Sequence, residues 1–117
     1  MVTLPKFRKE IINELMRLGK ITRNYDLFEL GYYMDLVNFQ IEKLEENISK
    51  CNIPEALSWY EDAIYTLNIV KEKAIKTKIP EHLQLDLSPK VITNMKNEIR
   101  AGLNEGIRTC SLRGLIR

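Results

Sequence analysis

The feature that most constrains this chain is a run of apolar residues separated alternately by four and three positions. Its members follow one another through the middle of the sequence: Leu30, Met34, Val37, Ile41, Leu44 and Ile48. Because an α-helix turns once in about 3.6 residues, this spacing places them all on one side of a helix. We therefore predict a helix over residues 26–49, on the order of 36 Å long, whose apolar seam faces other helices.

The N-terminal part of the chain is expected to form a shorter helix before the long one. Pro5 suits the first turn of a helix, and Gly19 suits its C-terminal cap. Between them lie apolar residues at helical spacing: Phe7, Ile11, Ile12, Leu15 and Leu18. This pattern predicts one amphipathic helix between the proline and the glycine.

Two further helices are predicted after the long one. Asn52 is expected to cap the third helix through its side chain, with Glu55 completing a capping box. Its buried stripe is predicted to be Leu57, Tyr60, Ile64, Leu67 and Val70. Ser88 and Pro89 then indicate the start of a fourth helix. The inner face of that helix is predicted to be Ile92, Met95, Ile99 and Leu103.

These helices and their mostly short connections indicate an all-α fold, a mostly antiparallel four-helix bundle. At 117 residues the chain fits a single domain. We expect the bundle to span residues 1–107, with residues 108–117 as a short basic tail or a final helical turn. No apolar run reaches the roughly 20 residues that cross a bilayer, and no signal-peptide pattern is present. We therefore expect a soluble, cytoplasmic protein that does not bind membranes.

Little in the sequence points to catalysis or to metal binding. Cys51 and Cys110 lie outside any CxxC pattern, so we expect two separate thiols in a reducing cytoplasm and no zinc site. His82 is the only histidine, and an enzyme would need it to act together with Glu81 or Asp86. Glycine-rich phosphate-binding motifs do not occur. We predict a protein without catalytic residues, metal or cofactor.

Charge is distributed unevenly along the chain. Residues 1–23 carry six basic and two acidic groups, whereas residues 24–62 carry nine acidic and two basic groups. Two later basic clusters are candidates for contacting nucleic-acid phosphates: Lys71, Lys73, Lys76 and Lys78, and then Arg108, Arg113 and Arg117. Neither cluster contains aromatic residues that could stack on bases. The alternative function is therefore a small helical nucleic-acid-binding protein of viral or defence origin, with both clusters on one contiguous basic face.

Aromatic residues on the predicted helix surfaces are candidates for contacts with other proteins. The apolar seam occupies a different side of the long helix from Tyr32 and Phe39. Trp59 and Tyr60 are neighbours and cannot both point along one stripe, so we expect Trp59 near the surface. These rings could anchor an interface, or they could wrap the edge of the bundle. Tyr32, Phe39 and Trp59 are our candidate interface residues, in a non-catalytic interaction subunit that forms homo- or hetero-oligomers.

Several short patterns follow one another in a characteristic order along the chain. They are the amphipathic residues 7–18, Tyr32-Tyr33, Leu44-Glu45-Glu46-Asn47-Ile48, Ala74-Ile75-Lys76-Thr77-Lys78-Ile79 and Leu87-Ser88-Pro89-Lys90. In this order they resemble the helical domain of archaeal GINS subunits, which belong to the replicative helicase assembly. The chain departs from the family pattern at Lys71 and Lys73, where arginine is more usual. It also has no room for the small β domain that often accompanies the helical one.

This resemblance implies a non-catalytic scaffold that assembles with related subunits. It also implies a bridge between the helicase motor and a RecJ-like partner. The exposed aromatic residues and the acidic centre of the chain would then contact other subunits.

Overall fold

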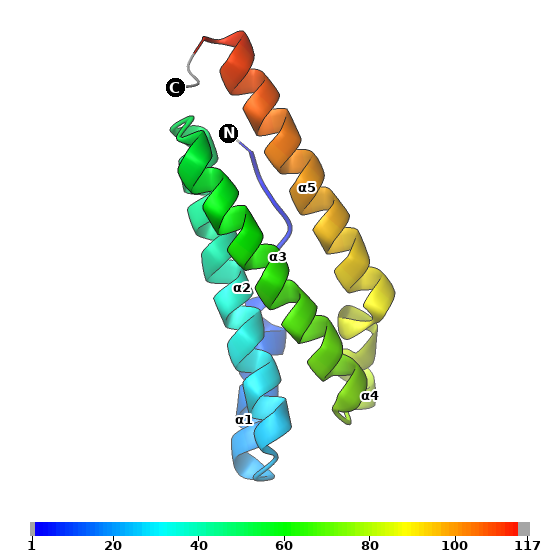
Figure 1. Cartoon of the computed structure of the whole chain (residues 1–117). Helices are drawn as coiled ribbons and strands as arrows, with labels where there is room; N and C mark the ends of the chain where they lie inside the picture. The colour runs from blue at the N-terminus through cyan, green and yellow to red at the C-terminus, as the bar shows by residue number, and fades with distance from the viewer. Residues whose placement is uncertain (1, 115–117) are drawn as a thin grey trace.

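The computed structural model describes residues 2–114, which form helices joined by short connections (Figure 1). The elements are α1 (Lys9–Ile21), α2 (Tyr25–Ser49), α3 (Ile53–Lys76), the short α4 (Glu81–Gln84), the 3-10 turn η1 (Leu85–Leu87) and α5 (Pro89–Leu112). They build an elongated molecule of 53 × 22 × 20 Å. The prediction of an all-α helical bundle is confirmed, and no strand occurs in the described part of the chain. None of the helices within residues 2–114 has the length and apolar character needed to cross a lipid bilayer.

The long helices α2 and α3 lie side by side and form the centre of the bundle (Figure 1). Every residue of the predicted seam on α2 is at most 3% exposed, which confirms both the helix and its buried side. On α3, Ala56, Ala63 and Val70 are buried at seven-residue spacing. Leu57 is turned about 100° from Ala56 and is 42% exposed, so its predicted place in the buried stripe is wrong.

The first helix begins later than the sequence predicted. α1 starts at Lys9, and both Pro5 and Phe7 lie in an extended N-terminal segment, residues 2–8. Gly19 does not cap α1, because the helix continues beyond it. A Cβ atom at Gly19 would lie 2.5 Å from the backbone nitrogen of Phe28. This glycine therefore permits the close approach of α1 to α2 instead of ending the helix.

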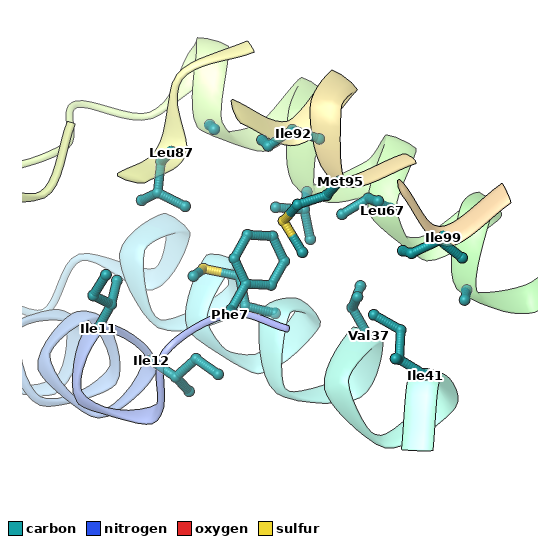
Figure 2. Close-up of a cluster of buried hydrophobic side chains, with 14 of the residues drawn as sticks. Phe7, Ile11, Ile12, Val37, Ile41, Leu67, Leu87, Ile92, Met95 and Ile99 are labelled. Atoms are coloured by element: carbon teal, nitrogen blue, oxygen red, sulfur yellow. The ribbon is translucent and has the colours of Figure 1, made fainter. Parts of the chain in front are cut away.

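Polar side chains of α2 hold the N-terminal segment in its extended form. The Asn38 amide accepts a hydrogen bond from Phe7 N at 2.9 Å and donates one to the Phe7 carbonyl at 2.8 Å. Glu45 accepts hydrogen bonds from Leu4 N at 2.7 Å and from the Lys6 ammonium at 2.6 Å. The Phe7 ring thereby reaches the core between the helices (Figure 2). Glu45 and Asn38 therefore fix this segment against α2.

The cap at the start of α5 agrees with the prediction, whereas the cap at the start of α3 does not. The Ser88 hydroxyl accepts a hydrogen bond from Val91 N, which confirms the predicted cap. Asn52 makes no such side-chain bond at the start of α3, so the capping box predicted there is wrong. The predicted inner face of α5 is buried (Figure 2). α5 ends at Leu112, within residues 108–117, for which a basic tail or a final helical turn was predicted.

A disulfide links Cys51, in the turn between α2 and α3, to Cys110 near the end of α5. The prediction of two separate thiols is therefore wrong: the fold brings their Cα atoms within 5.7 Å although 59 positions separate them. Gly106 permits this approach, since a Cβ there would lie 2.5 Å from Cγ2 of Ile48. Disulfides persist mainly in oxidising compartments, so cysteine chemistry no longer supports the cytoplasmic localisation, which stays a prediction.

Candidate protein-interaction surface

Two of the predicted interface residues stand on the outer side of α2. Tyr32 is 53% exposed and Phe39 is 48% exposed. They are seven positions apart, which is about two helical turns, so they lie on the same side of the helix. The structure places both rings at the surface, away from the buried seam.

Trp59 meets Phe39 across the contact between α3 and α2. The two rings are edge to face, with centroids 5.9 Å apart. Trp59 also packs against the core and is half-buried, so it is less exposed than the sequence suggested. Its neighbour Tyr60 turns toward α5, where its hydroxyl accepts a hydrogen bond from Arg100 at 3.3 Å. The two neighbours therefore pack toward different helices, as the offset between adjacent helical residues requires.

A second pair of rings lies nearer the start of α2, and one of its members was not among the candidate interface residues. Tyr33 contacts Tyr32 edge to face, with ring centroids 5.4 Å apart. Being one position after Tyr32, Tyr33 is turned toward α3, where the Lys73 ammonium lies 5.6 Å from its ring centroid. The Lys43 ammonium lies 5.7 Å from the Phe39 ring in the same way. We call the surface formed by Tyr32, Tyr33, Phe39 and Trp59 the aromatic face.

Carboxylates hold both of these lysines in place beside the rings. Glu46 pairs with Lys43 at 3.4 Å and with Lys50 at 3.2 Å. The hydrogen bond from Lys50 is the largest of the effects that lower the pKa of Glu46. Lys73 pairs with Glu29 at 3.3 Å. The lysines beside the aromatic face therefore already form ion pairs within the chain.

The described members of the two predicted basic clusters lie at opposite ends of the molecule (Figure 1). Cys51 lies two positions before the start of α3, and its disulfide brings the end of α5 with Arg108 to this place. Lys76 ends the 24-residue α3, roughly 35 Å away. The described residues therefore do not form the contiguous basic face that the nucleic-acid alternative requires.

Several members of these clusters have partners inside the chain. The Lys71 ammonium donates to the Thr93 hydroxyl at 3.4 Å, and Lys73 pairs with a carboxylate of α2. Arg108 pairs with Glu105 at 2.6 Å, and its hydrogen bonds lower the pKa of Glu105. The remaining candidates are Lys76, Lys78 and Arg113, which are exposed, and Arg117, which lies outside the described residues.

The histidine that an enzyme would need, His82, lies at the surface of the molecule. His82 and Glu81 are both exposed on α4, whereas Asp86 pairs with Arg8 at 3.4 Å. Across residues 2–114, no group of three or more His, Cys, Asp or Glu side chains is placed to hold a metal ion. Within residues 2–114 the aromatic face brings together four rings from two helices, and we take it as the candidate interaction surface.

Comparisons with protein-family models, with curated proteins and with solved structures find no match to this chain. The likeness to GINS helical domains therefore rests on the residue patterns of the sequence.

Proposed function

We propose that this protein is a non-catalytic interaction subunit that binds another protein through its aromatic face. The observation that carries the proposal is the Phe39–Trp59 pair, which spans two long helices with one ring half-exposed and the other half-buried. Rings that are already packed on one side lose little conformational freedom on binding and bury a large area. Such rings are effective anchors, because the helices beneath them keep them in position.

The likeness to GINS helical domains gives this proposal a more particular form. In this form the chain is a scaffold in a DNA-replication helicase complex. Its aromatic face then contacts a related subunit in a hetero-oligomer, or a second copy in a homo-oligomer. Support comes from the order of the residue patterns and from the helical hairpin that displays the rings.

A tagged pull-down from the native host, after nuclease treatment, tests the proposal. Captured proteins are identified by mass spectrometry for the wild type, for Phe39→Ala and for Leu57→Ala. Leu57 is a matched control, because it is 42% exposed but lies on the other side of α3 from Trp59. We expect the partner to be lost with Phe39→Ala and retained with Leu57→Ala. Equal capture by both variants contradicts the proposal, and replication-helicase subunits among the captured proteins support its scaffold form.

The same experiment without nuclease addresses the nucleic-acid alternative. Lys76 and Lys78 are exposed at one end of α3, so they are the lysines of their cluster best placed to meet phosphates. Binding that appears only with intact nucleic acid, falls steeply with salt and is lost in Lys76→Glu/Lys78→Glu favours this alternative. None of these results is expected if the protein binds another protein through its aromatic face.

A further inference from the structure

Exposed carboxylates surround the rings of the aromatic face on α2. Asp35 follows Tyr32 by three positions and precedes Phe39 by four, so it lies one helical turn from each ring. Glu42 follows Phe39 by three positions. Both carboxylates are exposed. Each exposed ring of α2 therefore has an acidic neighbour on its own side of the helix.

α3 repeats this arrangement around Trp59. Glu55 precedes Trp59 by four positions and Asp62 follows it by three, and both are exposed. Within residues 2–114, neither of them forms an ion pair, and the same holds for Asp35 and Glu42. Two helices thus present rings and unpaired carboxylates together on one surface.

Few basic groups lie in the part of the chain that carries these carboxylates. Residues 24–62, which contain α2 and the first part of α3, carry nine acidic and two basic groups. Both of these basic groups, Lys43 and Lys50, pair with Glu46. Lys73, which reaches the face from further along α3, pairs with Glu29. The aromatic face is therefore acidic as well as apolar.

We propose that the aromatic face docks a basic amphipathic helix of a partner protein. This inference rests on the proposed function and adds the chemistry of the partner. The apolar side of such a helix packs on the rings, and its flanking Lys and Arg side chains meet the four carboxylates. Arg and Lys suit both components of the face, because they pair with carboxylates and also lie favourably over aromatic rings.

The shape of the face favours a helix over an extended peptide. α2 and α3 lie side by side and their backbone groups are bonded within the helices, so they offer no strand edge for β-addition. Tyr32 and Phe39 are seven positions apart, which matches the repeat of anchors on an amphipathic helix. A docked helix then continues the bundle as one more member.

Selection from a library of helical peptides displayed on phage tests this inference on the oxidised full chain. Enriched peptides are synthesised and titrated while the fluorescence of Trp59, the only tryptophan, is followed. The test variant, Asp35→Asn/Asp62→Asn, removes two carboxylates from the face. The control variant, Glu81→Gln/Glu98→Gln, removes two exposed carboxylates from α4 and α5. Circular dichroism checks that both variants retain the helical fold.

We expect enriched peptides to carry Lys or Arg on both sides of an apolar stripe. Their affinity should fall roughly tenfold in Asp35→Asn/Asp62→Asn, stay unchanged in the control, and weaken as salt is added. Enrichment of neutral or acidic peptides overturns the inference, as does no enrichment or equal affinity for both variants. A dimer that forms as the protein concentration rises and is lost in Phe39→Ala also overturns the inference, because the aromatic face would then bind a second copy of this chain.

The outcomes also separate this inference from the proposed function. If neutral or acidic peptides are enriched and Phe39→Ala abolishes their binding, the aromatic face is an interface but its partner is not basic. If Phe39→Ala changes neither peptide binding nor the pull-down, both proposals fail.

Discussion

The bond between Cys51 and Cys110 joins residues 59 positions apart, and we predict that its loss destabilises the protein by about 4 kcal/mol. Closing a loop of this length restricts the unfolded chain, and the entropy removed grows with the logarithm of the loop length. The unfolding entropy is about 2.1 cal/mol/K per residue, so the loss lowers the melting temperature of this 117-residue chain by roughly 16 °C. A shift of this size is large compared with that of most single substitutions.

Thermal unfolding followed by far-UV circular dichroism, with and without a phosphine reductant, measures this effect. Thiol titration shows when Cys51 and Cys110 are both reduced. The variant Cys51→Ala/Cys110→Ala is the control, and it should melt near the reduced wild type and show no response to the reductant. A fall of less than about 4 °C in the fully reduced wild type refutes the loop-entropy argument. It would mean that the unfolded chain is already compact without the bond.

Three further predictions concern two contacts between packed elements and one carboxylate that pairs with neighbouring lysines. Asn38→Ala leaves the peptide N–H and carbonyl of Phe7 without partners, so urea unfolding should show that the free energy of unfolding falls by about 1–3 kcal/mol. An unchanged urea midpoint would mean that these hydrogen bonds do not hold the N-terminal segment in place. Gly106→Ala presses a methyl group against Ile48. The cost of this overpacking, about 1–3 kcal/mol, should exceed the gain in helix propensity and lower the melting temperature. A higher melting temperature contradicts this prediction. Because lysine partners lower the pKa of Glu46 below its ordinary 4.5, its stabilising contribution is present above that pH and is lost as pH falls through the lowered pKa. At neutral pH the urea midpoint of Glu46→Gln should therefore be lower than that of the wild type, and in strong acid the two midpoints should coincide. A difference that does not change with pH would mean that the ionised Glu46 carboxylate is not its cause.

Short-range spacing determined which segments become helices. The seam that includes Leu30, Met34 and Val37 predicts α2 and its buried side, because helical periodicity depends only on positions within a few turns. The Ser88 cap is equally local, since its hydrogen bond reaches only to Val91. The positions of Tyr32 and Phe39 at the surface follow from the same periodicity, because a residue outside the seam points away from the core.

Contacts between distant residues could not be read from the sequence in this way. Pro5 and Phe7 fit a helical pattern, yet Asn38, 31 positions after Phe7, holds the segment extended. Its effect depends on where α2 lies, which local spacing does not encode.

The disulfide and the Phe39–Trp59 contact also depend on how distant elements pack together. Cys51 and Cys110 meet only because α5 returns to the turn between α2 and α3. Phe39 and Trp59 form one surface only because α2 and α3 pack at a particular register. Helical periodicity thus defined the elements and their buried sides. The disulfide, the clamped N-terminal segment and the aromatic face arose when those elements packed together, because each depends on the relative position of elements that local spacing leaves free.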